Sequence, residues 1–248
     1  MVGVLQYFSN EADALANTNT LGSSGYYTVG NPSNFGYSHW RLASTSTGSS
    51  SQLVVYANGA VLNSGSEIFY RLYPASPCFL EGTKILCQIE GKEEYIHIEK
   101  LKVGDLVKTS RDGFKKIEVI GKGEIQNPGN DERIESRLYK CSPSRYPELT
   151  EDIYITGCHS ILVDNITDVE REKTIAQLGR IFVTDKKYRL TASIDQRAEP
   201  WVSEGKYTIW HLALENENDK MNYGIYASGL LVESCAIHSL KNRSNMKC

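Results

Sequence analysis

The feature that most constrains this chain is an abrupt change in composition near residue 77. Residues 1–77 contain only five charged side chains, whereas every other charged residue and all six cysteines lie in residues 78–248. A change this sharp is typical of a domain boundary. The sequence therefore predicts one domain over residues 1–77, a second over residues 78–237, and a short tail at residues 238–248. Pro74 and Pro77 favour an extended, helix-free junction.

The first segment is rich in Ser, Thr, Asn, Gly and Tyr and is predicted to be a small β-module of unknown role. Short strands are expected at residues 25–29, 52–57 and 68–73. Asn58-Gly59 predicts a two-residue hairpin turn, because a type I′ turn needs positive φ at both central positions. A helical apolar pattern occurs only at residues 10–16. The core of so short a segment is marginal, so we expect it to lean on the second segment or on a partner.

The second segment is also predicted to be β-rich, as a barrel or a folded-over sandwich of short strands. Strands are expected at residues 83–89, 106–109, 116–121, 153–156, 207–214 and 224–227. Hairpin turns are expected at residues 90–92 and 111–113. The polar residues 126–150 suggest a long loop or insertion. Residues 168–180 predict a short, charged helix that ends at Gly179.

Charge and cysteine usage exclude several classes of function. The net charge is −3, and a protein that binds nucleic acid or an anionic membrane normally carries a basic excess. No apolar run approaches the roughly 18 residues of a membrane span, and the first residues lack the basic and apolar regions of a secretory signal. The cysteines form no CxxC pair, so we expect neither a disulfide scaffold nor a metal site nor any other cofactor. An intracellular, mostly reduced protein is expected.

Four sequence blocks carry the chemical signal, and their order and spacing are more specific than any one of them. They are C-F-L-E-G-T-K-I at 78–85, I-E-K-L-K-V-G-D-L-V at 98–107, T-G-C-H-S-I-L-V at 156–163 and A-S-G-L-L-V-E-S-C at 227–235. Together they resemble the Hint domain, the self-processing module shared by Hedgehog proteins and inteins, over roughly residues 78–237. The last block resembles the Hedgehog-type form that ends in Ser-Cys. The resemblance implies an all-β, horseshoe-like fold of folded-over strands.

The resemblance implies a self-cleavage chemistry that the residue types can also perform. The thiol of Cys78 would attack the carbonyl carbon of Pro77, so that the amide becomes a thioester through an N-to-S acyl shift. His159 would protonate the freed amine of Cys78, since an unperturbed imidazole titrates near neutrality. Thr156 would offer its hydroxyl to the strained peptide or to the developing oxyanion. A second nucleophile then resolves the thioester and releases residues 1–77.

Three departures from the family pattern narrow the expected activity. Inteins place an Asn before their closing residue, whereas Glu233-Ser234 precedes Cys235 here, so protein splicing is not expected. Only 13 residues follow Cys235, too few for a sterol-recognition region, so cholesterol transfer is not expected. The ring of Pro77 crowds the carbonyl that must be attacked, so thioester formation would be slow or the module would stay uncleaved.

The other cysteines are interpreted with less help from the motifs. Cys235 could receive the acyl group, form a disulfide with Cys78, or close the β-core. Cys158 is expected on the opposite face of a strand from the neighbouring histidine, and therefore in the core. Cys87 and Cys141 are interpreted in the same way.

His211 and Asp195 are further candidates. The imidazole of His211 could approach the site from a late strand, although a structural role is expected. Asp195 could supply a base that activates the second nucleophile, but nothing in the spacing assigns it this role.

Two other functions compete with self-cleavage. Large proteins with domains of this type occur in giant DNA viruses, so the chain could be a virion component that contacts other capsid or virion proteins and keeps an uncleaved Hint-like scaffold. The charge-poor first segment suits a packed assembly. A conventional cysteine hydrolase that acts on other chains would instead need a substrate cleft separate from residues 74–77.

Overall fold

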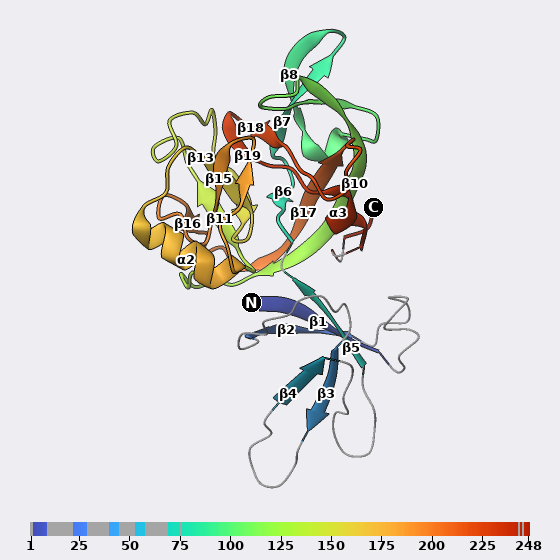
Figure 1. Cartoon of the computed structure of the whole chain (residues 1–248), viewed down its shortest axis with the longest axis vertical. Helices are drawn as coiled ribbons and strands as arrows, with labels where there is room; N and C mark the ends of the chain where they lie inside the picture. The colour runs from blue at the N-terminus through green and yellow to red at the C-terminus, as the bar shows by residue number, and fades with distance from the viewer. Residues whose placement is uncertain are drawn as a thin grey trace. The chain divides into compact units, whose positions relative to one another are not determined.

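We describe the protein from a computed structural model of residues 1–248. The structure describes the backbone of residues 2–8, 22–28, 40–44, 53–57 and 69–74, and residues 76–242, 244 and 246–248 with their side chains. The chain divides into two compact units, Met1–Ala75 and Ser76–Cys248 (Figure 1). This division lies next to the change in composition at residue 77.

The described strands of the first unit form one antiparallel sheet in the order β2-β1-β5-β3-β4. Its strands are β1 (Val2–Phe8), β2 (Gly22–Thr28), β3 (Trp40–Ser44), β4 (Leu53–Ala57) and β5 (Phe69–Pro74). Strands β2, β4 and β5 match the three expected strands, whereas β1 and β3 were not predicted. The expected turn at Asn58-Gly59 and the helical pattern at residues 10–16 lie outside the described residues. Strand β5 continues through Pro74, which agrees with the extended, helix-free backbone expected at the junction.

The second unit is also mostly β-structure, which confirms the predicted all-β class. Its strands are β6 (Phe79–Leu80), β7 (Lys84–Ile89), β8 (Lys92–His97), β9 (Leu106–Lys108), β10 (Phe114–Asn127), β11 (Leu138–Cys141), β12 (Ile153–Thr156), β13 (Ser160–Val163), β14 (Val183–Thr184), β15 (Lys187–Thr191), β16 (Glu199–Pro200), β17 (Gly205–Leu214), β18 (Gly224–Ala227) and β19 (Leu230–Glu233). Its helical elements are η1 (Ile98–Lys100), α2 (Asp168–Leu178) and α3 (Ile237–Asn242).

These strands join into one long antiparallel sheet that does not close on itself. The path runs β14-β15-β13-β19-β18-β7-β9-β10-β17-β6-β12-β11-β16, with β8 paired to β7. The two ends of this path, β14 and β16, are two-residue strands that do not pair with each other, so of the two expected arrangements the closed barrel is excluded. Strand β6 lies between β12 and β17, which sets the start of the second unit in the middle of the sheet.

Local sequence signals shape the sheet where they were expected to do so. Glu90 and Gly91 adopt φ values of 49° and 82° between β7 and β8, as a primed hairpin turn requires. Helix α2 begins with a capping box between Thr167 and Glu170. It ends at Gly179, whose φ of 78° is the left-handed C-cap conformation that glycine adopts readily.

The prediction of a long loop over residues 126–150 is wrong in part. Strand β10 extends to Asn127, and β11 inserts between β12 and β16 within this range. The four residues of β11 are flanked by polar turns, which hid the strand in the sequence. None of the helices in the described part of the chain has the length and apolar content needed to span a bilayer.

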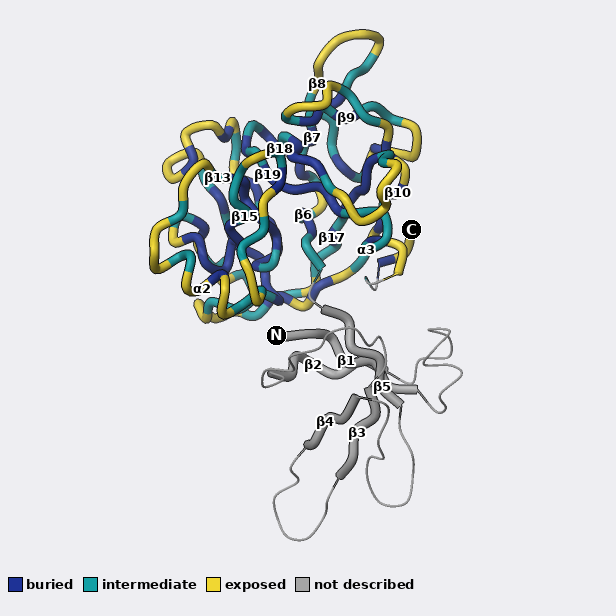
Figure 2. The backbone as a smooth tube through the Cα atoms, in the orientation of Figure 1, coloured by how far each residue is buried: buried dark blue, intermediate teal, exposed yellow. Residues whose placement is uncertain are grey.

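Two apolar clusters fill the second unit. The larger contains Cys87 and Cys141, both fully buried, which confirms their predicted core position. In Figure 2, the strands β18 and β19, which contribute to this cluster, are largely dark blue and therefore buried. We call the smaller one the thiol cluster, and its members are Cys78, Val119, Ile125, Leu138, Ile209, Ala213, Cys235, Leu240 and Met246.

Candidate functional site

Cys78 sits directly before β6, at the first residues of the second unit. Its side chain has no exposed surface, and its thiol lies 3.6 Å from the thioether sulfur of Met246. Burial raises the pKa of the Cys78 thiol well above its ordinary value, and the nearby Cys158 and Cys235 raise it further. The thiol is therefore protonated at neutral pH and needs a base before it can act as a nucleophile.

Thr156 holds the backbone on both sides of Pro77. Its hydroxyl accepts a hydrogen bond from the amide of Cys78 at 2.9 Å and donates to the carbonyl of Ser76 at 3.1 Å. Its own amide donates to the carbonyl of Cys78 at 3.0 Å. Thr156, at the end of β12, thus holds the peptide segment on both sides of Pro77.

His159 is brought beside Cys78 by a tight turn after β12. A Cβ atom on Gly157 would lie only 2.5 Å from the carbonyl oxygen of Ile134, so the turn needs glycine at this close approach. The amide of His159 donates to the carbonyl of Thr156 at 2.9 Å, and its ring packs on Phe79 with a centroid distance of 4.4 Å. The imidazole is fully buried against the first residue of β6.

The two ring nitrogens of His159 have different surroundings. Nε2 lies 3.1 Å from the carbonyl oxygen of Glu233, and because a carbonyl can only accept, Nε2 carries a hydrogen. Nδ1 has no hydrogen-bond partner among the described residues. Burial lowers the pKa of His159, while the carboxylate of Glu233 and the backbone of Cys78 oppose this shift. The neutral ring therefore keeps a lone pair on Nδ1.

Glu233 is a buried anchor that the sequence did not single out, although it lies in the last quoted block. Its carboxylate accepts from the amide of Ser160 and the side chain of Asn222, both at 3.0 Å, and forms an ion pair with Arg189. These contacts fasten β19 to the strand that follows His159. The carbonyl that orients the imidazole is thereby held in place.

Cys235 and Cys78 belong to the same thiol cluster. The amide of Cys235 donates to the carbonyl of Leu212 at 2.9 Å, which ties this residue to the end of β17. Burial raises the pKa of Cys235 to about 12, and the carboxylate of Glu233 adds to the shift. Both thiols are free. The four predicted site residues, Cys78, Thr156, His159 and Cys235, therefore gather in one region.

The core interpretation of Cys158 is wrong. Residues 157 and 158 form a turn rather than a strand, so alternation along a strand does not apply. The thiol of Cys158 lies 3.4 Å from the hydroxyl of Thr156, and its proximity raises the pKa of Cys78. Cys158 therefore belongs to the site.

Of the two further candidates, His211 lies next to His159, whereas Asp195 is engaged in an ion pair. His211 is fully buried, and its ring centroid lies 5.0 Å from that of His159. The carboxylate of Asp195 is instead paired with the guanidinium of Arg197 at 2.7 Å. Asp195 thus has a structural partner.

No sequence pattern indicated that Met246 contacts Cys78. The backbones of Lys122 and Lys247 exchange two hydrogen bonds of 2.8 Å, which fixes residues 246–248 across β10. Gly121 lets this segment approach, because a Cβ there would lie 3.1 Å from the Cβ of Met246. Residues 246–248 of the expected tail are therefore packed on the sheet, and Met246 covers the Cys78 thiol.

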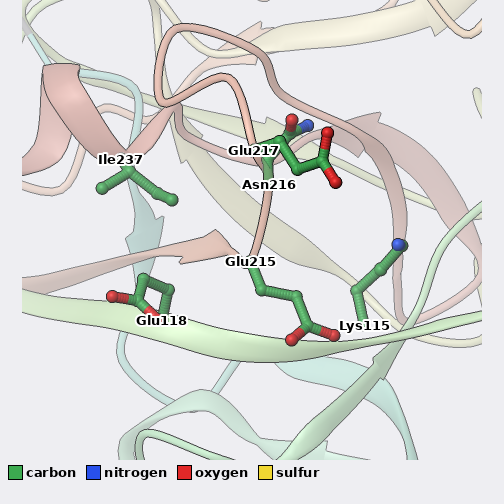
Figure 3. A pocket seen from close by; sticks show the side chains of 6 residues that line it. All are labelled: Lys115, Glu118, Glu215, Asn216, Glu217 and Ile237. Atoms are coloured by element: carbon green, nitrogen blue, oxygen red, sulfur yellow. The ribbon is translucent and has the colours of Figure 1, made fainter.

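A pocket of about 590 Å³ lies elsewhere on the second unit (Figure 3). It is lined by Lys115, Glu118, Glu215, Asn216, Glu217 and Ile237. None of these is a predicted site residue.

The fold and the site define an all-β protein with a buried Cys-Thr-His arrangement at the start of its second unit. No protein-family model matches the chain, and no curated protein matches it.

Proposed function

We propose that the second unit is a Hint-type self-processing module that cleaves the chain between Pro77 and Cys78. The observation that carries the proposal is that the Thr156 hydroxyl accepts from the Cys78 amide and donates to the Ser76 carbonyl, on either side of Pro77, while His159 packs on Phe79. The thiol, the hydroxyl and the imidazole come from three separate parts of the chain. Their meeting at one peptide bond supports a reaction at that bond.

The proposed reaction begins when Cys78 Sγ attacks the carbonyl carbon of Pro77. The new S–C bond replaces the C–N bond, and the amine of Cys78 leaves with the proton that the thiol gave up. Thr156 holds the leaving nitrogen through the hydrogen bond of 2.9 Å, and the lone pair on His159 Nδ1 is available for proton transfer. Water or another nucleophile then cleaves the thioester and releases residues 1–77.

A second function, an uncleaved scaffold, is favoured by a specific observation, whereas its viral setting rests on the family resemblance alone. Cys78 is fully buried beneath Met246, and its pKa is raised, so the resting thiol is neither accessible nor ionised. A hydrolase that acts on other chains is disfavoured. The Thr156 hydroxyl already donates to the carbonyl of Ser76, so residues 76–77 fill the place where a foreign substrate would bind.

Incubation of the full chain with hydroxylamine or dithiothreitol tests the main proposal. Either reagent traps a thioester, so we expect intact-mass spectrometry to find a new fragment that begins at Cys78. A Cys78→Ala variant should stay intact. A Pro77→Ala variant should cleave faster, because the carbonyl is then less crowded. If both the parent chain and Pro77→Ala remain whole after long incubation, self-cleavage is excluded and the scaffold function stands.

A further inference from the structure

His211 is a buried polar side chain without a polar partner. It lies on β17 with no exposed surface, and neither ring nitrogen has a hydrogen-bond partner among the described residues. Its ring packs edge-on against Phe79 at a centroid distance of 5.4 Å and lies 5.0 Å from the ring of His159. Leaving two buried nitrogens unpaired is unfavourable for folding, so such a group in a native core calls for an explanation.

The register of β6 and β17 pairs Ile209 with Leu80 and Trp210 with Phe79, so the same register extended by one residue sets His211 opposite Cys78. Side chains two residues apart on a strand share one face, and the neighbours of His211 on its face are Ile209 and Ala213. Both belong to the thiol cluster, together with Cys78 and Cys235. His211 therefore shares its strand face with members of this cluster, while its ring lies beside that of His159.

The charge state of His211 suits a proton acceptor. Burial lowers its pKa well below the ordinary value, and the neighbouring His159 and Arg189 lower it further. A neutral imidazole carries a lone pair on one ring nitrogen. His159, in contrast, holds its hydrogen on Nε2 against the carbonyl of Glu233, so its Nδ1 must first gain a proton before it can give one away.

We propose that His211 accepts the thiol proton of Cys78 and passes it to His159, which delivers it to the leaving amine. This inference rests on the proposed self-cleavage. One proton moves from sulfur to nitrogen while the S–C bond forms and the C–N bond breaks, so the step needs no other reactant. Both imidazoles are neutral at rest, and the relay places only one transient positive charge on the pair. With His211, the proposed site has two proton-transfer groups instead of one.

Replacing His211 by leucine tests the relay in the full chain. The variant keeps an apolar side chain of similar size and removes two unpaired nitrogens, so we expect an unchanged or higher Tm. Hydroxylamine-induced cleavage should slow at least about 100-fold, as loss of an acid–base group predicts. A purely structural residue would not gain stability while losing activity. His238→Leu is the matched control, because His238 lies on α3 beside Asp219, and it should cleave like the parent.

Chemical rescue provides the second readout. In His211→Ala, imidazole added to the buffer can enter the space that the ring leaves, and it should restore cleavage at least about tenfold, within the range that acid–base groups contribute. The inference is overturned if His211→Leu cleaves within about threefold of the parent. It is also overturned if a folded His211→Ala cleaves slowly without any response to imidazole. A parent chain that never cleaves would instead reject the proposed function itself.

Discussion

Thr156 and Cys78 form a reciprocal pair: the Cys78 amide donates to the Thr156 hydroxyl at 2.9 Å, and the Thr156 amide donates to the Cys78 carbonyl at 3.0 Å. The two residues are 78 positions apart in the sequence. Their pairing joins the residue before β6 to the end of β12 and fixes the backbone around Pro77. The same contacts therefore support both the fold and the proposed reaction.

Thr156→Val should weaken both properties. The variant leaves the Cys78 amide and the Ser76 carbonyl without their partner, so the free energy of unfolding should fall by roughly 1–3 kcal/mol. Cleavage should slow by roughly 10²–10³-fold, the usual effect of removing one such hydrogen-bonding group. Urea denaturation and a cleavage time course measure the two effects. Thr156→Ser keeps the hydroxyl and should retain most of the parent's free energy of unfolding and cleavage rate. Equal cleavage rates for the Val and Ser variants would contradict this role.

The stability of the second unit should fall as the pH drops below about 6.5. Burial lowers the pKa of both His159 and His211, so the unfolded chain binds protons more readily than the folded chain below about pH 6.5. Their stabilising contribution is present above that pH and is lost as pH falls, by up to about 1.4 kcal/mol per pH unit for each ring.

Urea denaturation at three pH values measures this slope. Glu124 and Glu151, whose pKa values are lowered by ion pairing with Lys206 and Lys84, lose their contribution only below about pH 4.5 and do not interfere. His211→Leu should reduce the slope by about half, since one of the two titrating rings is gone. A flat profile in the parent chain would show that the imidazoles are not buried in their neutral form.

Met246 should protect the Cys78 thiol from reagents. Because the two sulfurs are 3.6 Å apart and Cys78 has no exposed surface, Met246→Ala should raise the rate at which iodoacetamide alkylates Cys78 by roughly tenfold or more. Peptide mapping distinguishes Cys78 from the other cysteines. Met246→Leu keeps the cover and should react like the parent, and Met221→Ala, at a side chain that is 52% exposed, is a surface control.

Glu233→Gln should destabilise the chain more than a similar change at the surface. The substitution leaves Arg189 without its buried partner, a loss that typically reaches about 3–5 kcal/mol in fully buried pairs. Because Arg189 is partly exposed, we expect the loss in the free energy of unfolding to lie at the lower end of this range. Glu151→Gln breaks the surface pair with Lys84 and should change the free energy of unfolding by less than about 1 kcal/mol. Thermal or urea unfolding of the two variants tests the difference.

Local patterns predicted the elements whose cues lie close together in the sequence. The turn at Glu90 and Gly91 and the end of α2 at Gly179 each depend on a few adjacent residues, so they could be recognised. Strand β11 was missed, since its four residues have no local cue apart from their neighbours in the sheet. Cys158 was misplaced for a related reason. The alternation rule holds only within a strand, and the turn at Gly157 requires glycine because the backbone of Ile134, distant in the sequence, approaches it closely.

By itself, the sequence determined the all-β class, the change in composition near residue 77 and the motif that contains Cys78, Thr156 and His159. Only the tertiary structure decided which groups surround the thiol. Met246 contacts the Cys78 thiol through the packing of residues 246–248 on β10, and the pairing of β17 with β6 sets His211 across from Cys78. Contacts of this kind depend on strand order and burial over long sequence separations, and no local pattern encodes them.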